Sequence, residues 1–338
     1  MIIEMQKGVT NSQIESVKQR IKELGFDYQL NSGEELTVIA VLGKETGSCD
    51  TQVFEVLPGV EKVFRIEKAF KLASRDFQQK DTILKIGDVE IGGKNVVIMA
   101  GPCSVESEEQ ILACAEIAKQ KGAKILRGGA FKPRTSPFGF QGLKEDGLKI
   151  LAKAKERTGL LIITEAMSIE DVAVVADYAD IIQVGTRNMQ NYPLLTAVGK
   201  SHKPVLLKRG FAATLEEWLM AADWILREDN SSVILCERGI RTFSNCTRFT
   251  LDVGVVPVVK RFSHLPIIID PSHAAGYFGY VPVLAKAGVA AGADGLIVEI
   301  HPDPKKALSD GAQSLTFSDF SRLMEELKAI ASAIGRSI

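Results

Sequence analysis

From about residue 96 onward, short apolar runs alternate with longer amphipathic stretches along the chain. The runs are rich in Val, Ile and Leu with little polar–apolar alternation, which is typical of parallel strands buried on both faces. These runs are 96–101, 124–129, 161–166, 181–185, 204–210, 233–239, 267–273 and 295–301. The stretches between them have helical periodicity, and several begin with a Ser or Thr cap and an acidic first turn. They include 107–122, 143–159, 168–179, 214–228 and 317–335.

Eight strand–helix units in succession predict an α/β fold of the (β/α)8 TIM barrel type. A doubly wound open sheet is the alternative for such an alternating pattern. The dinucleotide-binding signature G-x-G-x-x-G does not follow the first run, so the barrel is favoured.

The first 70 residues follow a different order of elements. Their pattern predicts strand, helix, strand, strand, short helix and strand, which is the β-α-β-β-α-β order of a ferredoxin-like domain. We therefore expect a ferredoxin-like domain over 1–70, a polar linker over 71–82 and the barrel over 83–338. Within the last range, 83–93 (ILKIGDVEIGG) predicts a hairpin that closes the floor of the barrel.

Composition excludes several classes of protein. Lys and Arg number 41 against 42 Asp and Glu, a net charge of -1, so the whole chain has no bias toward nucleic acid or an anionic membrane. The apolar runs are far shorter than the roughly 18 residues of a membrane helix, and the start of the chain lacks the features of a signal peptide. Five cysteines without CxxC spacing favour reduced thiols in a cytoplasmic protein.

Polar groups gather where the predicted strands end. Barrel enzymes carry their chemistry at this end, and an unpaired buried charge costs several kcal/mol, so we expect a functional site there. The groups are Cys103, Arg127, Glu165, Arg187, Lys208, Arg209, Glu237, Arg238, Asp270, His273, Glu299 and His301.

Many of the groups near the strand ends are cations. In 127–142 (RGGAFKPRTSPFGFQG) three basic residues occur without any acidic residue. Arg offers planar bidentate donors for phosphate or carboxylate and Lys a compact charge, so the set predicts two polyanionic ligands or one with several phosphates. Its members are Arg127, Lys132, Arg134, Arg187, Lys208 and Arg238. Alternatively, some of these cations pair with carboxylates such as Glu165 and Glu237.

A second group combines a thiol, an imidazole and two carboxylates. Cys103, His273, Glu299 and Asp310 form a mixed sulfur, nitrogen and oxygen set that suits a divalent first-row metal. Two alternatives stay open: Cys103 is a small buried hydrophobe, or it forms a nucleophilic pair with a histidine.

Several motifs together resemble those of the 3-deoxy-D-arabino-heptulosonate 7-phosphate (DAHP) synthases. They are GPCSVES, RGGAFKPRTSP, GTRNMQN, LLKRG, ILCERGIRTF, DPSHAAG and IVEIHPDPKKALSDGAQSL, and the likeness covers about residues 80–335. It is greatest to the subclass with an N-terminal ferredoxin-like regulatory domain. The resemblance implies a metal-dependent, aldol-like condensation of phosphoenolpyruvate with erythrose 4-phosphate that releases phosphate, the first step of the shikimate pathway to aromatic amino acids.

The resemblance also implies roles for individual residues. Four would ligate a divalent metal such as Mn, Fe, Zn or Co: Cys103, His273, Glu299 and Asp310. Phosphoenolpyruvate would be bound by Arg127, Lys132 and Lys208 at its carboxylate and by Arg187 and Arg238 at its phosphate. Erythrose 4-phosphate would be bound by Lys132, Pro133, Arg134, Thr135 and Ser136. Lys132, Glu165 and His301 are candidates for positioning a water molecule or moving its proton.

For the small domain, the resemblance implies feedback inhibition by tyrosine or phenylalanine. A homotetramer is typical of relatives, and an external partner such as chorismate mutase is compatible with the sequence. The alternative is that the small domain is only a structural appendage.

Two short segments depart from the family's usual pattern. The chain has TSPFGFQG where relatives often have TSPYSFQG, and YFGY where charged residues often follow the DPSH motif. The second difference puts contacts of that loop in doubt, including contacts at a subunit interface.

Three other functions agree less well with the sequence. A 3-deoxy-D-manno-octulosonate 8-phosphate synthase shares the fold and phosphoenolpyruvate but typically carries KANRSS where this chain has KPRTS. A non-catalytic metabolite sensor is disfavoured by the intact metal-ligand candidates. A metal-dependent phosphohydrolase usually needs several His ligands, whereas this chain has four His in all.

Overall fold

The computed structural model describes residues 1–32, 37–43, 46, 49–65, 69–132 and 138–338. Contacts between Cα atoms divide the chain into two units. The first contains residues 1–80 with 262–264, and the second contains 81–261 with 265–338. Each unit has its own hydrophobic core.

The first unit has the predicted ferredoxin-like fold. Its elements are β1 (Ile2–Met5), α1 (Asn11–Glu23), β2 (Asp27–Ser32), β3 (Thr37–Leu42), α2 (Gln52–Glu55) and β4 (Val60–Phe64). The strands form an antiparallel sheet in the order β2-β3-β1-β4. Helix α1 buries Ile14, Val17 and Ile21, which recur at helical spacing, in one core cluster with residues of β1 and β3.

Residues 70–77 belong to the first unit, although the sequence predicted a polar linker from 71 onward. Phe70, Leu72, Ala73 and Phe77 are all buried, and the Asn31 amide donates to the Phe77 carbonyl at 3.4 Å. The segment therefore holds apolar side chains away from water instead of running freely between the two units.

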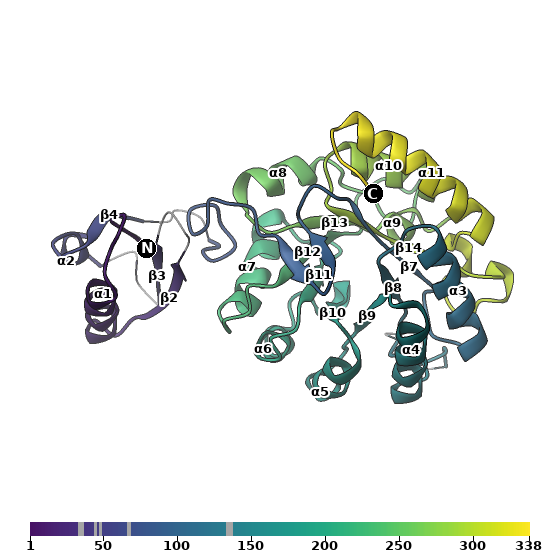
Figure 1. The fold of residues 1–338 in the computed structure, drawn as a ribbon, viewed down its shortest axis with the longest axis horizontal. Coiled ribbons are helices and arrows are strands. Elements are labelled where there is room, and N and C mark those ends of the chain that lie inside the picture. The colour runs from purple at the N-terminus through teal and green to yellow at the C-terminus, as the bar shows by residue number, and fades with distance from the viewer. Residues whose placement is uncertain (33–36, 44–45, 47–48, 66–68, 133–137) are drawn as a thin grey trace. The chain divides into compact units, whose positions relative to one another are not determined.

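The second unit is the predicted closed barrel of eight parallel strands (Figure 1). The strands are β7 (Val97–Gly101), β8 (Ile125–Arg127), β9 (Leu161–Glu165), β10 (Ile181–Val184), β11 (Val205–Lys208), β12 (Val233–Glu237), β13 (Ile267–Ile269) and β14 (Gly295–Glu299). Pairing of β14 with β7 closes the sheet. The surrounding helices are α3 (Glu108–Gln120), α4 (Glu145–Thr158), α5 (Ile169–Tyr178), α6 (Tyr192–Lys200), α7 (Leu215–Leu226), α8 (Val255–Phe262), α10 (Val281–Ala290) and α11 (Phe317–Ala333).

The floor of the barrel is apolar and is completed by a hairpin. Strands β5 (Leu84–Ile86) and β6 (Val89–Ile91) pair antiparallel, as the sequence predicted. Leu84, Val89 and Ile91 belong to the same core cluster as the inward side chains of the barrel strands. The hairpin therefore supplies the apolar side chains that shield the N-terminal ends of the strands from water.

Polar side chains form the next layer above this floor. Side chains two residues apart lie on the same face of a strand, and on most of the strands an apolar floor residue is followed by an inward polar residue. The pairs are Ile125 and Arg127, Ile163 and Glu165, Ile181 and Gln183, Leu206 and Lys208, Ile268 and Asp270, and Ile297 and Glu299. We call this polar layer the rim.

Strand β13 is shorter than the predicted run over 267–273. It ends at Ile269 because Asp270 caps a short helix, α9 (Pro271–Ala275), with Pro271 in its first turn. The backbone N–H of His273 donates to Asp270 Oδ1 at 3.0 Å. His273 consequently reaches the site from a helical turn and not from a strand.

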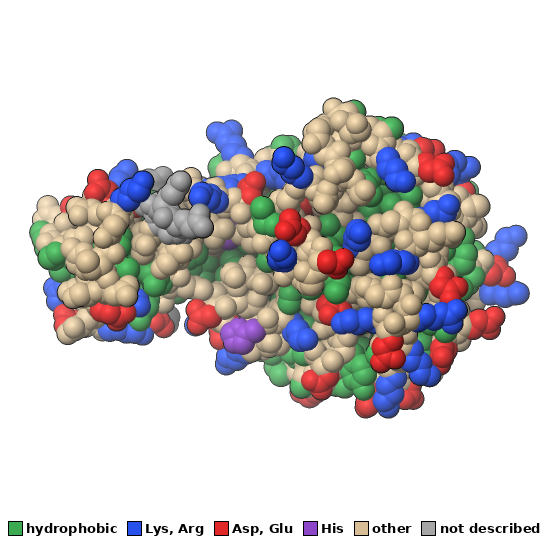
Figure 2. All heavy atoms as spheres, in the orientation of Figure 1, with side chains coloured by type: hydrophobic (Ala, Val, Ile, Leu, Met, Phe, Trp, Pro, Cys, Tyr) green, Lys and Arg blue, Asp and Glu red, His purple; other side chains and the backbone are tan. Residues whose placement is uncertain are grey.

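The visible outer surface carries charges of both signs. Figure 2 shows Lys and Arg interspersed with Asp and Glu on that face, in keeping with the net charge of -1. None of the helices in the described parts of the chain is both long and apolar enough to pass through a membrane.

Candidate active site

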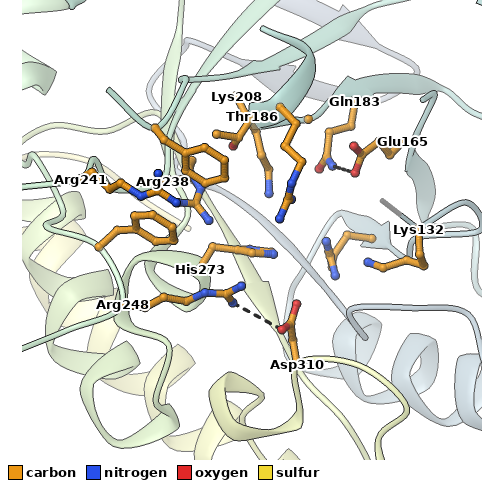
Figure 3. Close-up of a pocket in the computed structure, with 15 residues that line it drawn as sticks. Lys132, Glu165, Gln183, Thr186, Lys208, Arg238, Arg241, Arg248, His273 and Asp310 are labelled. Carbon is orange, nitrogen blue, oxygen red and sulfur yellow. Dashed lines mark hydrogen bonds and ion pairs between the residues drawn. The ribbon is translucent and has the colours of Figure 1, made fainter. Parts of the chain in front are cut away.

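A cavity of about 500 Å³ lies at the C-terminal ends of the barrel strands (Figure 3). Its described lining contains seven basic side chains and two acidic ones, Glu165 and Asp310. The basic residues are Arg127, Lys132, Arg187, Lys208, Arg238, Arg241 and Arg248. This excess of positive charge suits anionic ligands, because the cations otherwise repel one another in a confined space.

Two of the cations form buried ion pairs, as one alternative predicted, but their partners are not the Glu165 and Glu237 that it named. Arg127 Nη1 donates to Glu299 Oε1 at 2.9 Å, and Lys208 Nζ donates to Asp270 Oδ2 at 2.5 Å. These pairs neutralise part of the charge and fix the direction of each cation before any ligand binds.

Arg209 and Glu237, which the sequence placed among the polar groups at the strand ends, do not line the cavity. Arg209 Nη1 donates to Glu237 Oε2 at 2.9 Å, and the guanidinium lies over the Trp218 ring. Because Glu237 is adjacent to the inward Cys236 and Arg238, it points to the opposite face of the sheet. Burial raises the pKa of the Glu237 carboxyl, and the charge of Arg209 opposes that shift.

Arg238 is held by aromatic rings. Its guanidinium lies 4.1 Å from the centroid of Phe249 and 5.2 Å from that of Phe211, and the two rings stack on each other. Among the described residues, no carboxylate lies within ion-pair distance of Arg238. Burial lowers the pKa of its guanidinium to about 10, at which it is still charged at neutral pH. The side chain is buried, positively charged and available to an anion.

Two further arginines lie near the Phe211 ring. Arg187 and Arg241 lie 5.5 and 5.2 Å from the centroid of Phe211. Figure 3 shows Arg238, Arg241 and Arg248 together on one side of the cavity, with Lys132 and Glu165 on the other. The cavity thus has a side rich in guanidinium groups and a side with a lysine and a carboxylate.

Lys132 reaches the cavity through a space that only glycine leaves open. A Cβ atom at Gly129 would lie 2.8 Å from Lys132 Cδ and 2.9 Å from the Cys103 carbonyl oxygen. Lys132 Nζ donates to that oxygen at 2.8 Å and to Cys103 Sγ at 3.1 Å. The lysine therefore links the cation-rich cavity to the predicted metal ligands.

Glu165 and His301 occupy different surroundings. Glu165 lines the cavity and accepts a hydrogen bond from Gln183 Nε2 at 3.0 Å. Gly185 allows this position, because a Cβ there would lie 2.0 Å from Glu165 Oε1. His301 is buried and is not part of the described lining; its Nδ1 accepts from the Asp303 N–H, and its Nε2 lies 3.5 Å from Glu106 Oε2.

The four predicted metal ligands come together at the edge of the cavity. Cys103, His273, Glu299 and Asp310 each present a donor atom, and all four atoms lie within 4.8 Å of one another. Cys103 follows β7, His273 lies on α9, Glu299 ends β14, and Asp310 lies in the loop after β14 with φ at 51°. Donors on opposite sides of one ion are separated by roughly 4 to 4.6 Å at metal–ligand distances of 2.0–2.3 Å. The cluster is therefore close in size to a metal site.

The protonation of His273 also fits a metal. Burial lowers the pKa of its imidazole, so the ring is neutral at pH 7. Its Nδ1 lies 2.7 Å from Asp270 Oδ2, which assigns the proton to Nδ1 and leaves a lone pair on Nε2. That lone pair lies 3.4 Å from Glu299 Oε1, so two acceptors face each other. A cation between them removes the repulsion.

The thiol and the aspartate of the cluster differ in pKa. Burial, with a contribution from Glu299, raises the pKa of the Cys103 thiol to about 11, although Lys132 opposes the shift. Burial also tends to raise the pKa of Asp310, but His273 and Arg248 outweigh it, and the net pKa lies below the ordinary value. Asp310 is therefore ionised at neutral pH, whereas Cys103 needs a metal to become a thiolate.

Several residues of the cavity were not predicted from the sequence. They are Gln183, Thr186, Phe211, Arg241, Arg248 and Phe249. Gln183 follows Ile181 by two positions, so the strand period could have identified it. The others lie in loops, where no periodicity operates. The predicted ligands Pro133, Arg134, Thr135 and Ser136 lie outside the described residues.

A closed barrel with a strongly cationic cavity beside a mixed thiol, imidazole and carboxylate cluster defines an enzyme that acts on anionic substrates. Comparison with known families is specific. Residues 70–335 match the DAHP synthetase I family, and residues 1–68 match the DAHP synthase ferredoxin-like domain. The chain belongs to the DAHP synthetase I family and is an enzyme of the transferase type.

Individual relatives agree with this assignment. The chain is 47% identical over 335 residues to phospho-2-dehydro-3-deoxyheptonate aldolase of Thermotoga maritima, covering 99% of each protein. A crystal structure of that enzyme from Thermotoga maritima superposes with a TM-score of 0.80 and 47% identity, covering 99% of this chain and 98% of the other. A 2-dehydro-3-deoxyphosphooctonate aldolase of Geobacter sulfurreducens is 33% identical over 266 residues, 73% of this chain and 97% of that protein.

Proposed function

We propose that the protein condenses phosphoenolpyruvate with erythrose 4-phosphate to give DAHP and inorganic phosphate. The observation that carries the proposal is a single cavity with seven basic side chains next to the four-residue cluster. Two phosphorylated substrates repel each other, and such a cavity offsets that repulsion while holding their reacting carbons close.

Phosphoenolpyruvate is assigned to the region between the two sides of the cavity. Arg127, Lys132 and Lys208 bind its carboxylate, and Arg187 and Arg238 bind its phosphate. The ion pairs of Arg127 and Lys208 hold these cations in place, and the stacked rings do the same for Arg238. Arg134, Thr135 and Ser136, with Lys132 and Pro133, bind the phosphate end of the sugar.

The reaction forms one carbon–carbon bond and breaks one carbon–oxygen bond. C3 of phosphoenolpyruvate attacks the aldehyde carbon of erythrose 4-phosphate, whose oxygen gains a proton. Water adds at C2 and loses a proton, and the bond between C2 and the phosphate oxygen breaks to release phosphate. Glu165 is oriented by Gln183 inside the cavity and is the candidate to accept the proton of that water. Lys132 is the candidate to donate a proton, and His301, beside Glu106, has an indirect role at most in this arrangement.

We infer that Cys103, His273, Glu299 and Asp310 hold a divalent first-row metal. When bound, such an ion supplies Lewis acidity toward the aldehyde oxygen. The chain's own contribution is to keep His273 neutral through its burial and to aim its Nε2 by the hydrogen bond from Nδ1 to Asp270. Lys132 Nζ donates a hydrogen bond to the Cys103 sulfur.

The principal alternative is a 3-deoxy-D-manno-octulosonate 8-phosphate synthase. The 47% identity to the Thermotoga maritima enzyme extends through the N-terminal domain, whereas the Geobacter sulfurreducens relative is 33% identical and covers 73% of this chain. Phosphate release with phosphoenolpyruvate and either erythrose 4-phosphate or arabinose 5-phosphate, with and without a chelator, tests the proposal. Turnover with arabinose 5-phosphate alone would replace it, and inertness toward both sugars with several divalent metals would favour a non-catalytic sensor.

We assign regulation to residues 1–70, with 71–82 as the connection and 83–338 as the catalytic barrel. The match of residues 1–68 to the DAHP synthase ferredoxin-like domain supports this division. Tyrosine or phenylalanine is the proposed inhibitor, in a homotetramer, and chorismate mutase is a candidate partner. Inhibition assays with each amino acid and a measurement of mass in solution test these assignments.

A further inference from the structure

Arg248 lies in the connection between β12 and α8, far in sequence from the predicted metal ligands. Its backbone N–H donates to the Ala275 carbonyl at 3.2 Å, and that of Phe249 donates to Ala274 at 2.9 Å. Both carbonyls belong to α9, the short helix that carries His273. Gly276 permits this close approach, because a Cβ there would lie 2.5 Å from Arg248 Cβ. The base of the arginine is thus attached to the element that presents the imidazole.

The guanidinium of Arg248 contacts two acceptors in the loop after β14. Its Nη1 donates to Gln313 Oε1 at 2.9 Å and to Asp310 Oδ1 at 3.4 Å. Figure 3 shows this side chain extending across the cavity toward Asp310. Asp310 has a positive φ, a backbone conformation that an aspartate adopts only at some cost. The contact with Arg248 therefore helps to hold the Asp310 carboxylate in place.

Gln313 extends the contact to the second carboxylate. It is 2% exposed, and its Nε2 donates to Glu299 Oε2 at 2.8 Å. The orientation of the amide follows from its neighbours, because Arg248 offers only donors and an ionised Glu299 only acceptors. One arginine therefore reaches Asp310 directly and Glu299 through one buried amide.

We propose that Arg248 and Gln313 are positioning residues that fix the two carboxylates of the metal site. The inference deepens the proposed function and rests on it, since it assumes that Asp310 and Glu299 bind a metal. The chain Arg248–Gln313–Glu299, with the branch to Asp310, sets the direction of both carboxylate groups before the ion arrives. Neither residue is itself a ligand.

The direction of the change in metal affinity on removal of Arg248 separates a positioning role from the effect of its charge alone. A guanidinium next to a divalent cation repels it, so removing the arginine should tighten metal binding if its charge alone mattered. If Arg248 positions the carboxylates, removing it should weaken metal binding. Loss of partners that orient metal ligands typically costs roughly 10- to 100-fold in affinity.

The test is a titration of the full-length protein with Co²⁺. Binding is measured by the absorption band of the bond between Co²⁺ and a thiolate. We expect Arg248→Gln and Gln313→Met each to weaken Co²⁺ binding by roughly 10- to 100-fold. The double variant should be little weaker than either single one, because both residues act through one connected set of contacts. Arg248→Lys keeps a donor and a charge and should recover part of the loss.

Arg241→Gln is the matched control. Arg241 lies in the same connection and lines the same cavity, but no described contact joins it to Asp310 or Gln313. The Arg241→Gln substitution removes the same charge as Arg248→Gln, so the affinity for Co²⁺ should stay unchanged or rise slightly. At saturating Co²⁺, the thiolate band of Arg248→Gln should reach the intensity seen in the unaltered protein, because all four ligands are still present.

Two outcomes would overturn the inference. Equal or tighter Co²⁺ binding by Arg248→Gln, in a protein whose unaltered form shows the thiolate band, would remove the positioning role and leave the metal site standing. Absence of the thiolate band from the unaltered protein would overturn both the metal site and this inference. Because Arg248 is 41% exposed in its side chain, its substitution leaves the core intact and keeps the test valid.

Discussion

At the scale of single residues, burial keeps the Cys103 thiol protonated at neutral pH. The thiol has a pKa of about 11 because it is buried and close to Glu299. Lys132 contacts the sulfur and lowers this value only in part. His273, by contrast, is already neutral at pH 7. Metal binding therefore has to displace a proton from sulfur and none from the imidazole.

This difference predicts the pH dependence of metal affinity. Between pH 7 and pH 9 the thiol of the metal-free protein stays protonated, so one proton is released per ion bound. Affinity for Co²⁺ should rise about tenfold per pH unit in this range, because each unit makes release of that proton easier by a factor of ten. Titrations at pH 7, 8 and 9 measure the slope. Cys103→Ser is the control and should bind weakly with a nearly flat slope; an equally steep slope in that variant would contradict the argument.

Arg238 offers a second prediction at this scale. It is 4% exposed and has no described carboxylate partner, so its charge is poorly stabilised without a ligand. Arg238→Met should raise the KM for phosphoenolpyruvate by roughly 10- to 100-fold, the size of a charged hydrogen bond. The same variant should be as stable as the unaltered protein or up to about 2 kcal/mol more stable in denaturant unfolding without substrate.

The matched control for that experiment is Arg322→Met. Arg322 lies on α11, its side chain is 67% exposed, and it pairs only with Asp319 in the described contacts. The KM for phosphoenolpyruvate should stay the same, and the free energy of unfolding should change by no more than about 0.5 kcal/mol. Lower stability of Arg238→Met with an unchanged KM would show that the arginine supports the fold rather than the substrate.

At the scale of elements, strand periodicity explains why much of the site could be predicted. Runs of Val, Ile and Leu identified all eight strands, and the polar residue closing each run identified Arg127, Glu165, Lys208 and Glu299. The same reasoning failed to separate inward from outward positions. Arg209 and Glu237 were therefore placed on the cavity side, although they pair with each other on the other face of the sheet.

Loops account for the residues that sequence reasoning could not find. Arg241 and Arg248 belong to a connection whose course depends on backbone contacts with Phe211 and α9. Such contacts join residues distant in the chain, so spacing along the sequence carries no information about them. The four cluster residues were grouped from their donor chemistry and their positions at the strand ends, and the family resemblance implied the same set; their convergence depends on the closure of the whole barrel.

The floor hairpin gives a prediction for an element. Ile91 is fully buried in the same cluster as the inward residues of the strands. Ile91→Ala should lower the free energy of unfolding by roughly 2–5 kcal/mol, from lost burial and the cavity left behind. Denaturant unfolding measures this change. Values of kcat and KM at 25 °C should be unaffected, because the rim lies above the floor.

Ile83→Ala serves as the comparison, since Ile83 is next to the hairpin but 54% exposed. Its free energy of unfolding should change by no more than about 0.5 kcal/mol. Equal effects of the two substitutions would mean that the hairpin does not contribute to the barrel core.

At the scale of the whole molecule, the two units have separate cores. The core of the first unit contains residues of β1, β3, α1 and α2, and that of the second contains the barrel strands and the floor hairpin. The solved structure of a truncated form of DAHP synthase from Thermotoga maritima superposes on 79% of this chain with 48% identity and a TM-score of 0.75.

Deletion of residues 1 to about 70 is the corresponding prediction. The shortened protein should keep its catalytic activity, because every described residue of the cavity belongs to the second unit. Inhibition by tyrosine or phenylalanine should disappear. Phosphate release with and without each amino acid compares the two forms. Persisting inhibition in the shortened protein would assign the effector to the barrel and leave the small domain a structural role.

The succession of floor and rim residues along most of the strands also bears on how this barrel could be given new reactions. The buried apolar layer forms the core of the barrel, while the proposed chemistry uses polar positions two residues further on. A protein engineer could substitute the rim residues and leave the floor residues unchanged. Arg127 with Glu299, and Lys208 with Asp270, would have to be replaced two at a time, since each charge is held by its neighbour. Useful libraries for this scaffold should therefore vary these positions as coupled pairs.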